Sequence, residues 1–156
     1  MGKRITFSVS AWSSAPPGAV YDLLRDGATW PEWSPIGSFR LERGSRDGGE
    51  SLGAIRVFRT GTVSSREEIV GFEPGRSFSY TALSGLPIRS HRADVELTER
   101  DGGTAITWRE EFLAKRPGSG WLIERFLRGF VQRCADGLAR RAASVRPGDQ
   151  PAVPGR

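Results

Sequence analysis

The sequence contains very little of the chemistry on which disulfides, zinc sites and cysteine nucleophiles depend. Among its 156 residues there is one cysteine, Cys134, and one histidine, His91. A single cysteine excludes an internal disulfide, and one cysteine with one histidine excludes a zinc site of the usual kind. Cys134 falls inside an apolar helical pattern, which favours a core position over a nucleophile. We therefore expect no metal and no cofactor.

Long apolar runs and basic blocks are also missing. No stretch approaches the roughly 18 apolar residues that a membrane span needs. Residues 1–12 alternate in polarity, which is not the pattern of a signal peptide. The net charge is +5, but the arginines are scattered among acids, as in "SSREEIV" and "WREEFLAKR". We expect a cytoplasmic protein with no nucleic-acid partner and no membrane span, either a monomer or a homodimer.

Aromatic residues, by contrast, are well represented. There are 5 Trp and 8 Phe, and the segment 29–35, "TWPEWSP", holds two Trp and two Pro. A few large rings can build a core from few residues. The rings of this segment either plug a small core or close one end of a cavity. If one of them also touches a ligand, we expect it to be Trp33.

The hydrophobic pattern predicts one domain over residues 1–145, and the Pro- and Gly-rich residues 146–156 predict a disordered tail. Alternation near the N-terminus indicates a strand. Two short helices follow it, and residues 38–114 then read as consecutive strands separated by turns. From about residue 120 to 145, apolar residues recur every four positions, which is typical of a long helix that packs on a sheet. The predicted class is α+β: a curved antiparallel sheet of six or seven strands wrapped around a long C-terminal helix, with two short helices after strand 1.

This order of elements resembles the START-like (SRPBCC, helix-grip) superfamily, which includes polyketide cyclase/dehydrase and lipid-transport proteins and relatives of the birch-pollen allergen. The resemblance is carried by "APPGAVYDLLRDGATWPEWSP", by Gly53 with Arg56, and by "REEIVGFEPGRSFSY" and "GGTAITWREEF". It implies an internal cavity for a hydrophobic molecule. It brings no catalytic motif with it, so function has to be argued from the site.

Two predicted hairpins place polar residues on the inner face of the sheet. The Asp101-Gly102 turn pairs Ala93 with Glu110, which turns Glu110 inward together with His91. If the preceding hairpin turns at 84–87, Tyr80 lies opposite His91. Tyr80, His91 and Glu110 then form a polar strip across three strands, which we name as candidate catalytic residues because they could exchange a proton. A purely structural hydrogen-bond network is the alternative.

The remaining candidates are ligand-binding positions. Arg56 and Glu68 are expected to be cross-strand partners, and the pattern leaves open whether they face the cavity or solvent. Rings and aliphatic side chains of the inner face and the helix are expected to line the cavity: Phe58, Phe78, Val95, Trp108, Phe112, Phe126 and Phe130.

Three functions fit these observations. The first is binding of a lipid-like or polyketide-like molecule in the cavity. The second is a polyketide cyclase or dehydratase that uses the polar strip as acid and base. The third is a regulatory or stress-related protein whose cavity is occluded. The sequence favours the first.

Overall fold

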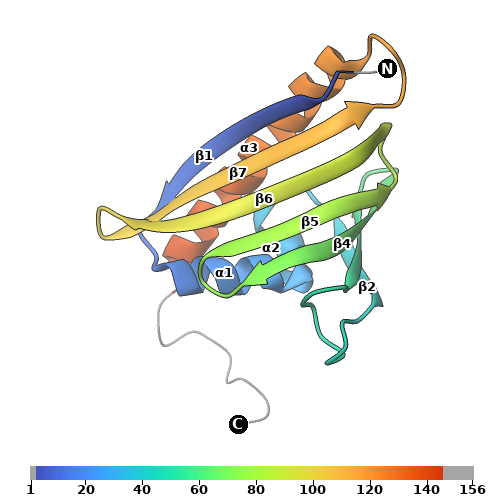
Figure 1. The fold of residues 1–156 in the computed structure, drawn as a ribbon. Helices are drawn as coiled ribbons and strands as arrows, with labels where there is room; N and C mark the ends of the chain where they lie inside the picture. Colours follow the sequence, from blue (N-terminus) through green and yellow to red (C-terminus); the bar gives the residue numbers. More distant parts are fainter. Residues whose placement is uncertain (1–2, 146–156) are drawn as a thin grey trace.

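The computed structural model describes residues 3–145, so the expected disordered tail lies outside the described residues. Figure 1 shows a strongly curved sheet with the long helix α3 (Gly120–Ser144) behind it. Two short helices, α1 (Pro17–Arg25) and α2 (Trp30–Trp33), cover one end of the sheet, with the single 3-10 turn η1 (Gly27–Thr29) between them. This is the predicted α+β architecture.

The sheet has seven antiparallel strands in the order β1-β7-β6-β5-β4-β3-β2. β1 therefore pairs with the last strand, with Val9 opposite Trp108. Apart from β1, the strands follow one another in sequence like a meander. Their bounds are β1 (Ile5–Ser13), β2 (Ser38–Arg43), β3 (Ile55–Thr60), β4 (Val63–Glu73), β5 (Ser77–Ser84), β6 (Ile88–Arg100) and β7 (Gly103–Ala114).

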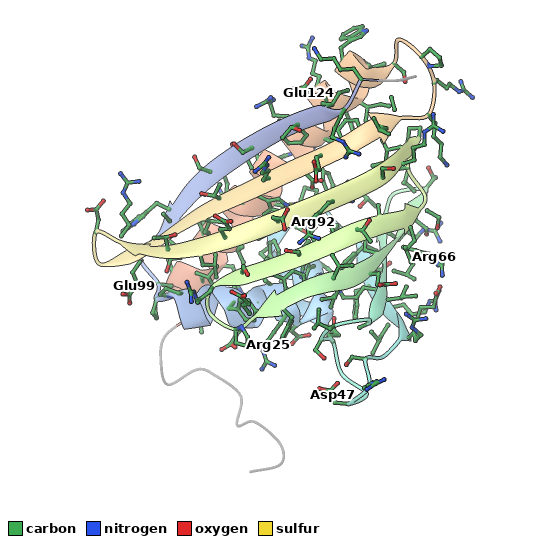
Figure 2. The ribbon with its side chains drawn as sticks, viewed as in Figure 1. Arg25, Asp47, Arg66, Arg92, Glu99 and Glu124 are labelled. Atoms are coloured by element: carbon green, nitrogen blue, oxygen red, sulfur yellow. The ribbon has the colours of Figure 1, made fainter. Side chains whose placement is uncertain are left out.

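The β6–β7 hairpin has the predicted register, with Val95 opposite Trp108 and Ala93 opposite Glu110. Asp101 and Gly102 both have positive φ (52° and 77°), which a two-residue turn of this kind requires. Apart from Glu110, charged side chains in the middle of these strands point away from the helix, as Figure 2 shows for Arg92. On that outer face Arg92 pairs with Asp94 at 3.1 Å.

The predicted register of the β5–β6 hairpin is wrong. Tyr80 pairs with Ala93, two positions further along β6 than His91. The regular ladder stops there, because the Thr81 hydroxyl bonds to the His91 carbonyl and the Ala82 N–H donates to His91 Nδ1. An even shift leaves side chains on the same face, so Tyr80 still points toward the helix.

Beyond that point β6 contains a bulge. Its pairing with β7 shifts between Arg89 and Arg92, which oppose Leu113 and Glu111, so Ser90 and His91 share one position opposite Phe112. Ser90 has a positive φ of 52°. Bulges of this type redirect a side chain, and here the residue they redirect is His91.

Helix α3 is buried only over its C-terminal part. Residues such as Cys134, Ala135 and Leu138 are fully buried, whereas Leu122 and Phe126 are 57% and 62% exposed. The predicted stripe of apolar residues every four positions is therefore not buried along its whole length. A four-residue step turns about 40° past one full turn, so such a stripe winds around the helix. None of the helices within residues 3–145 is both long and apolar enough to cross a bilayer.

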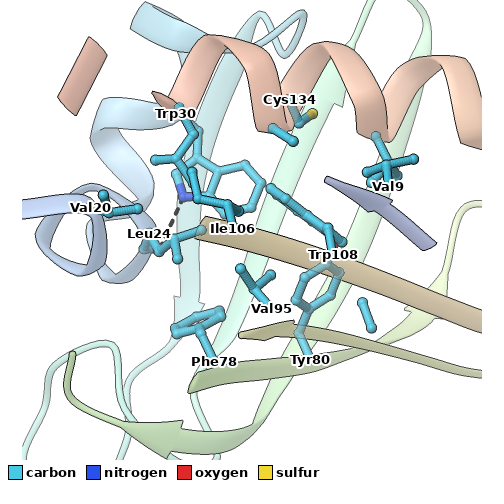
Figure 3. Packing of buried hydrophobic residues seen from close by; sticks show 14 of the residues in the cluster. Val9, Val20, Leu24, Trp30, Phe78, Tyr80, Val95, Ile106, Trp108 and Cys134 are labelled. Atoms are coloured by element: carbon cyan, nitrogen blue, oxygen red, sulfur yellow. Dashed lines mark hydrogen bonds between the residues drawn. The ribbon is translucent and has the colours of Figure 1, made fainter. Parts of the chain in front are cut away.

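Helices α1 and α2 together form a cap over one end of the sheet. The tryptophans of "TWPEWSP" pack this cap against the core. Trp30 donates its Nε1–H to the Leu24 carbonyl at 3.0 Å, the dashed line in Figure 3. Trp33 donates to the Thr29 hydroxyl at 3.1 Å. A Cβ on Gly137 of α3 would lie 1.7 Å from the Trp33 carbonyl oxygen, so only glycine fits there. This close approach at Gly137 holds α2 directly against α3.

Candidate functional site

A cavity of about 500 Å³ lies between the inner face of the sheet and α3. This is within the size range of small-molecule sites. Most of its wall is apolar or aromatic. The sheet and cap contribute Trp30, Phe58 and Trp108, and α3 contributes Phe126, Leu127, Phe130 and Val131. Because Leu122 and Phe126 line the cavity and are also exposed, the N-terminal part of α3 forms its mouth.

Tyr80, His91 and Glu110 all line this cavity and are in contact with one another. Each is less than a tenth exposed. The Tyr80 hydroxyl donates to Glu110 Oε1 at 3.4 Å, and His91 Nε2 bonds to Glu110 Oε2. Trp108 donates its Nε1–H to the Tyr80 oxygen at 3.2 Å. Both Glu110 oxygens therefore accept from neighbours, which a buried carboxylate requires.

The backbone of β5 selects one tautomer of His91. Nδ1 accepts the Ala82 N–H at 2.8 Å, so in the neutral ring the proton is on Nε2 and faces Glu110. Burial disfavours the charged ring, but the hydrogen bond and charge of Glu110 outweigh it and raise the pKa of His91. A second proton would have to go to Nδ1, which would break the bond from Ala82.

A second carboxylate, Glu67, also lines the cavity. It lies on β4 opposite Ala82 of β5 and Arg56 of β3. Its Oε1 is buried and has no hydrogen-bond partner within residues 3–145. Desolvation raises the pKa of Glu67 to about 7, although Arg56 and His91 oppose the shift. The charge of Glu67 is thus poorly compensated by the protein itself.

The sequence pattern named Glu68 as a candidate with its face left open, and it did not name Glu67. Glu68 is on the outer face, 3.7 Å from Arg43. Counting back in twos from Ile69, which is 1% exposed, reaches Glu67 and then Ser65. The alternation of β4 therefore contained the signal, but Ile69 had to be recognised as the anchor of the inner face.

Arg56 faces inward but does not reach the cavity. It is completely buried, and its Nη1 donates to the Leu24 carbonyl at 3.0 Å and lies 3.5 Å from Glu50 Oε1. Its guanidinium lies about 5 Å from the centroids of three rings, those of Trp30, Phe58 and Phe78. Nε and Nη2 have no partner among the described residues. Arg56 ties β3 to the cap and does not line the site as a ligand contact would.

Four other expected ligand positions are absent from the cavity wall. Phe78, Val95 and Phe112 are completely buried in the core. Trp33, in α2, packs against Trp30, and the ring of this segment that lines the cavity is that of Trp30. For Phe78 the neighbour that closes it off is Tyr21 of α1, whose ring centroid lies 6.2 Å away.

Cys134 lines the cavity but has little reactive character. Its thiol is buried, and desolvation raises its pKa far above the usual range, so almost none is thiolate at neutral pH. No group of three or more His, Cys, Asp or Glu side chains within residues 3–145 is arranged to hold a metal ion.

Comparison with known proteins shows the same architecture elsewhere. The family model described as "Polyketide cyclase / dehydrase and lipid transport" matches residues 4–143. A protein from Thermobifida fusca solved by NMR is 27% identical, with a TM-score of 0.73 over 88% of this chain and 92% of the other. No curated protein matches the chain.

Two further solved structures share the fold at lower identity. A START superfamily protein from Mycobacterium smegmatis is 12% identical, with a TM-score of 0.75 over 88% of this chain and 96% of that one. Ara h 8.0201 is 17% identical, with a TM-score of 0.74 over 92% of this chain and 100% of that one.

Proposed function

Because the chain belongs to the polyketide cyclase/dehydrase and lipid transport family, we propose that it binds a hydrophobic small molecule in the cavity between the sheet and α3. The observation that carries the proposal is the cavity itself, about 500 Å³ with a mostly aromatic and aliphatic wall. Burial of apolar surface would supply the affinity, at roughly 25 cal/mol per Å².

The mouth supports the same proposal. Leu122 and Phe126 are large apolar side chains left in solvent beside the opening, and the Phe126 ring stacks on that of Phe130 at 6.3 Å. Exposed apolar patches next to a cavity mark sites of binding. An occluded cavity, the third function considered above, accounts for neither the open volume nor this mouth.

Titration with Nile red, a neutral apolar dye, tests the proposal. We expect saturable binding of one dye per chain and quenching of tryptophan fluorescence, since Trp30 and Trp108 line the cavity. Ile123→Trp, which fills the cavity from α3, should abolish binding. Arg125→Trp, on the exposed side of the same helix, is the matched control and should bind normally. Equal binding by both variants would place the dye elsewhere.

A polyketide cyclase or dehydratase is the second candidate, favoured by the contact of Tyr80 and His91 with Glu110 inside an apolar cavity. In dehydration of a β-hydroxyketone, Glu110 would take the α-proton. The β-hydroxyl would leave as water with a proton from Tyr80 or His91, which gives an enone. Absorbance of the enone from a naphthyl β-hydroxyketone measures this. Turnover that Glu110→Gln abolishes would support the reaction, and absence of turnover with tight binding would favour binding alone.

A further inference from the structure

The cavity is acidic although the protein is basic. The chain has 23 Lys and Arg residues against 18 Asp and Glu. Yet the cavity wall contains two carboxyl groups, Glu67 and Glu110, and no lysine or arginine. His91 is the one wall residue that can become cationic, and it is already bonded to Glu110. A ligand in the cavity therefore meets two carboxyl groups and no lysine or arginine side chain.

The donors around Glu110 are already used within the protein. Trp108 donates to Tyr80, Tyr80 donates to Glu110, and the Nε2–H of His91 faces Glu110 as well. Thr60 and Ser65 also line the cavity, but their hydroxyls are neutral and cannot balance the charge of a carboxylate. The cavity therefore has acceptors to offer a ligand, but no free charged donor.

Glu67 is the acceptor that the protein leaves unpaired. Its Oε1 has no partner, while the side chain as a whole is only partly buried and lines the cavity. Arg56 is its neighbour on β3, but that guanidinium is directed to the Leu24 carbonyl and to Glu50. The charges of Arg56 and His91 act on Glu67, but no described residue hydrogen-bonds to its Oε1 or forms an ion pair with it, which a carboxylate in apolar surroundings needs.

We propose that the ligand of this cavity carries an amine, bound as an ammonium group at Glu67, with its apolar part against the aromatic wall. The proposal rests on the proposed binding function and specifies its ligand class. An ammonium group brings up to three donors and one positive charge, which are what the wall lacks. A ligand carboxylate would be a third anion without a free donor, and an alcohol brings one donor and no charge.

The proposal has a pH signature. Titratable groups face Glu67 from every element around it: Arg56 on β3, Tyr80 on β5, His91 on β6, Glu110 on β7 and Cys134 on α3. An ammonium ligand binds the ionised form of Glu67, so its affinity should rise with pH until Glu67 is fully ionised. A ligand carbonyl would instead need the protonated form, and its affinity should fall over the same range.

The experiment compares three probes with one skeleton: naphthylmethylamine, naphthylmethanol and naphthoic acid. Calorimetric titration near pH 7 should rank the amine first, about tenfold tighter than the alcohol, with the acid weakest. The amine should also gain several-fold in affinity between about pH 6 and pH 8, while the alcohol should not. In Glu67→Gln the preference for the amine should disappear while the alcohol still binds. Glu68→Gln, on the outer face, is the control and should change neither probe.

The possible failures are distinguishable. If neither Nile red nor any of the three probes binds, the proposed binding function fails together with this inference, whereas Nile red binding without amine binding overturns this inference alone. If amine and alcohol bind equally, or Glu67→Gln keeps the preference, the cavity binds apolar molecules but the amine proposal is wrong. Should Glu67→Gln not fold, the pH dependence of the wild-type protein still decides, because an affinity for the amine that falls with rising pH overturns the proposal.

Discussion

The Tyr80 hydroxyl lies 3.4 Å from Glu110 Oε1 although a strand separates the two residues. Tyr80 on β5 and Glu110 on β7 both pair with the same residue of β6, Ala93. Ala93 is completely buried, and its single methyl group leaves the space above β6 in which the longer side chains meet. The contact between Tyr80 and Glu110 in the cavity therefore requires a small residue at position 93.

The first prediction concerns this position. Ala93→Leu should separate Tyr80 from Glu110 and overpack the inner face, which typically costs about 1–3 kcal/mol of stability. We expect Nile red affinity to fall at least tenfold. Ala105→Leu, on β7 and only partly buried, is the matched control and should keep the affinity. Unfolding in urea and dye titration measure the two effects. An Ala93→Leu variant with wild-type affinity would show that the Tyr80–Glu110 contact does not shape the cavity.

The second prediction is a pH dependence of stability caused by Glu67. Its pKa is about 7 in the folded protein against an ordinary value of 4.5. Between these values the folded state holds a proton that the unfolded chain has released, so stability falls as pH rises through this window. The loss is at most about 3 kcal/mol, because the side chain keeps part of its surface open to the cavity.

Glu67→Gln removes this titration, so the variant should be more stable than the wild-type protein at about pH 8 and nearly equal to it at about pH 4. Urea unfolding at a series of pH values measures the difference. Glu68→Gln, which changes an exposed pair with Arg43, should follow the wild-type curve. A Glu67→Gln curve parallel to wild type would mean that Glu67 ionises normally in the folded state.

The third prediction uses the single histidine. His91 is the only source of imidazole signals, so an NMR titration reports on it without assignment. We expect a midpoint above the ordinary 6.5, because Glu110 stabilises the charged ring. A raised pKa stabilises the fold most below 6.5, and this contribution is lost as pH rises through the folded midpoint. Glu110→Gln should lower the midpoint. An unchanged midpoint in that variant would contradict the pairing with Glu110.

The fourth prediction concerns the cavity mouth. Phe126→Ala removes an exposed ring, so it should change the free energy of unfolding by less than about 1 kcal/mol. It should nevertheless speed dissociation of Nile red, because the ring stacks on Phe130 beside the opening. Stopped-flow dilution measures that rate. Trp121→Ala, equally exposed on α3 but outside the cavity wall, should leave the rate unchanged.

The inward-facing residues of the site could be predicted from the sequence where a recognisable turn set the strand register. The Asp101-Gly102 turn and strict alternation fixed the β6–β7 register, so the inward position of Glu110 could be predicted. The β5–β6 register could not, because the Thr81 hydroxyl bonds to the His91 carbonyl and the Ala82 N–H bonds to the His91 ring in place of the regular ladder. The face of Tyr80 was still correct, since the error was an even number of residues.

Glu67 was missed for a different reason. Local polarity does not distinguish Glu67 from Glu68, and the alternation of β4 decides between them only once Ile69 is recognised as a buried inner-face residue. Which inward rings line the cavity could likewise not be predicted, because it depends on how far the cap extends over the sheet. Whether an inward ring such as Phe78 or Phe58 reaches open space is set by the packing of Trp30 and Arg56, residues distant in sequence.

The most direct test of the central claim, that the cavity holds a hydrophobic small molecule, is native mass spectrometry of the purified protein followed by solvent extraction. We predict a folded species heavier than the polypeptide by one compound, which extraction recovers as an apolar molecule and which Ile123→Trp fails to retain. If the protein has only its polypeptide mass, and still does so after incubation with Nile red or naphthylmethylamine, the cavity is not a binding site and the account is wrong.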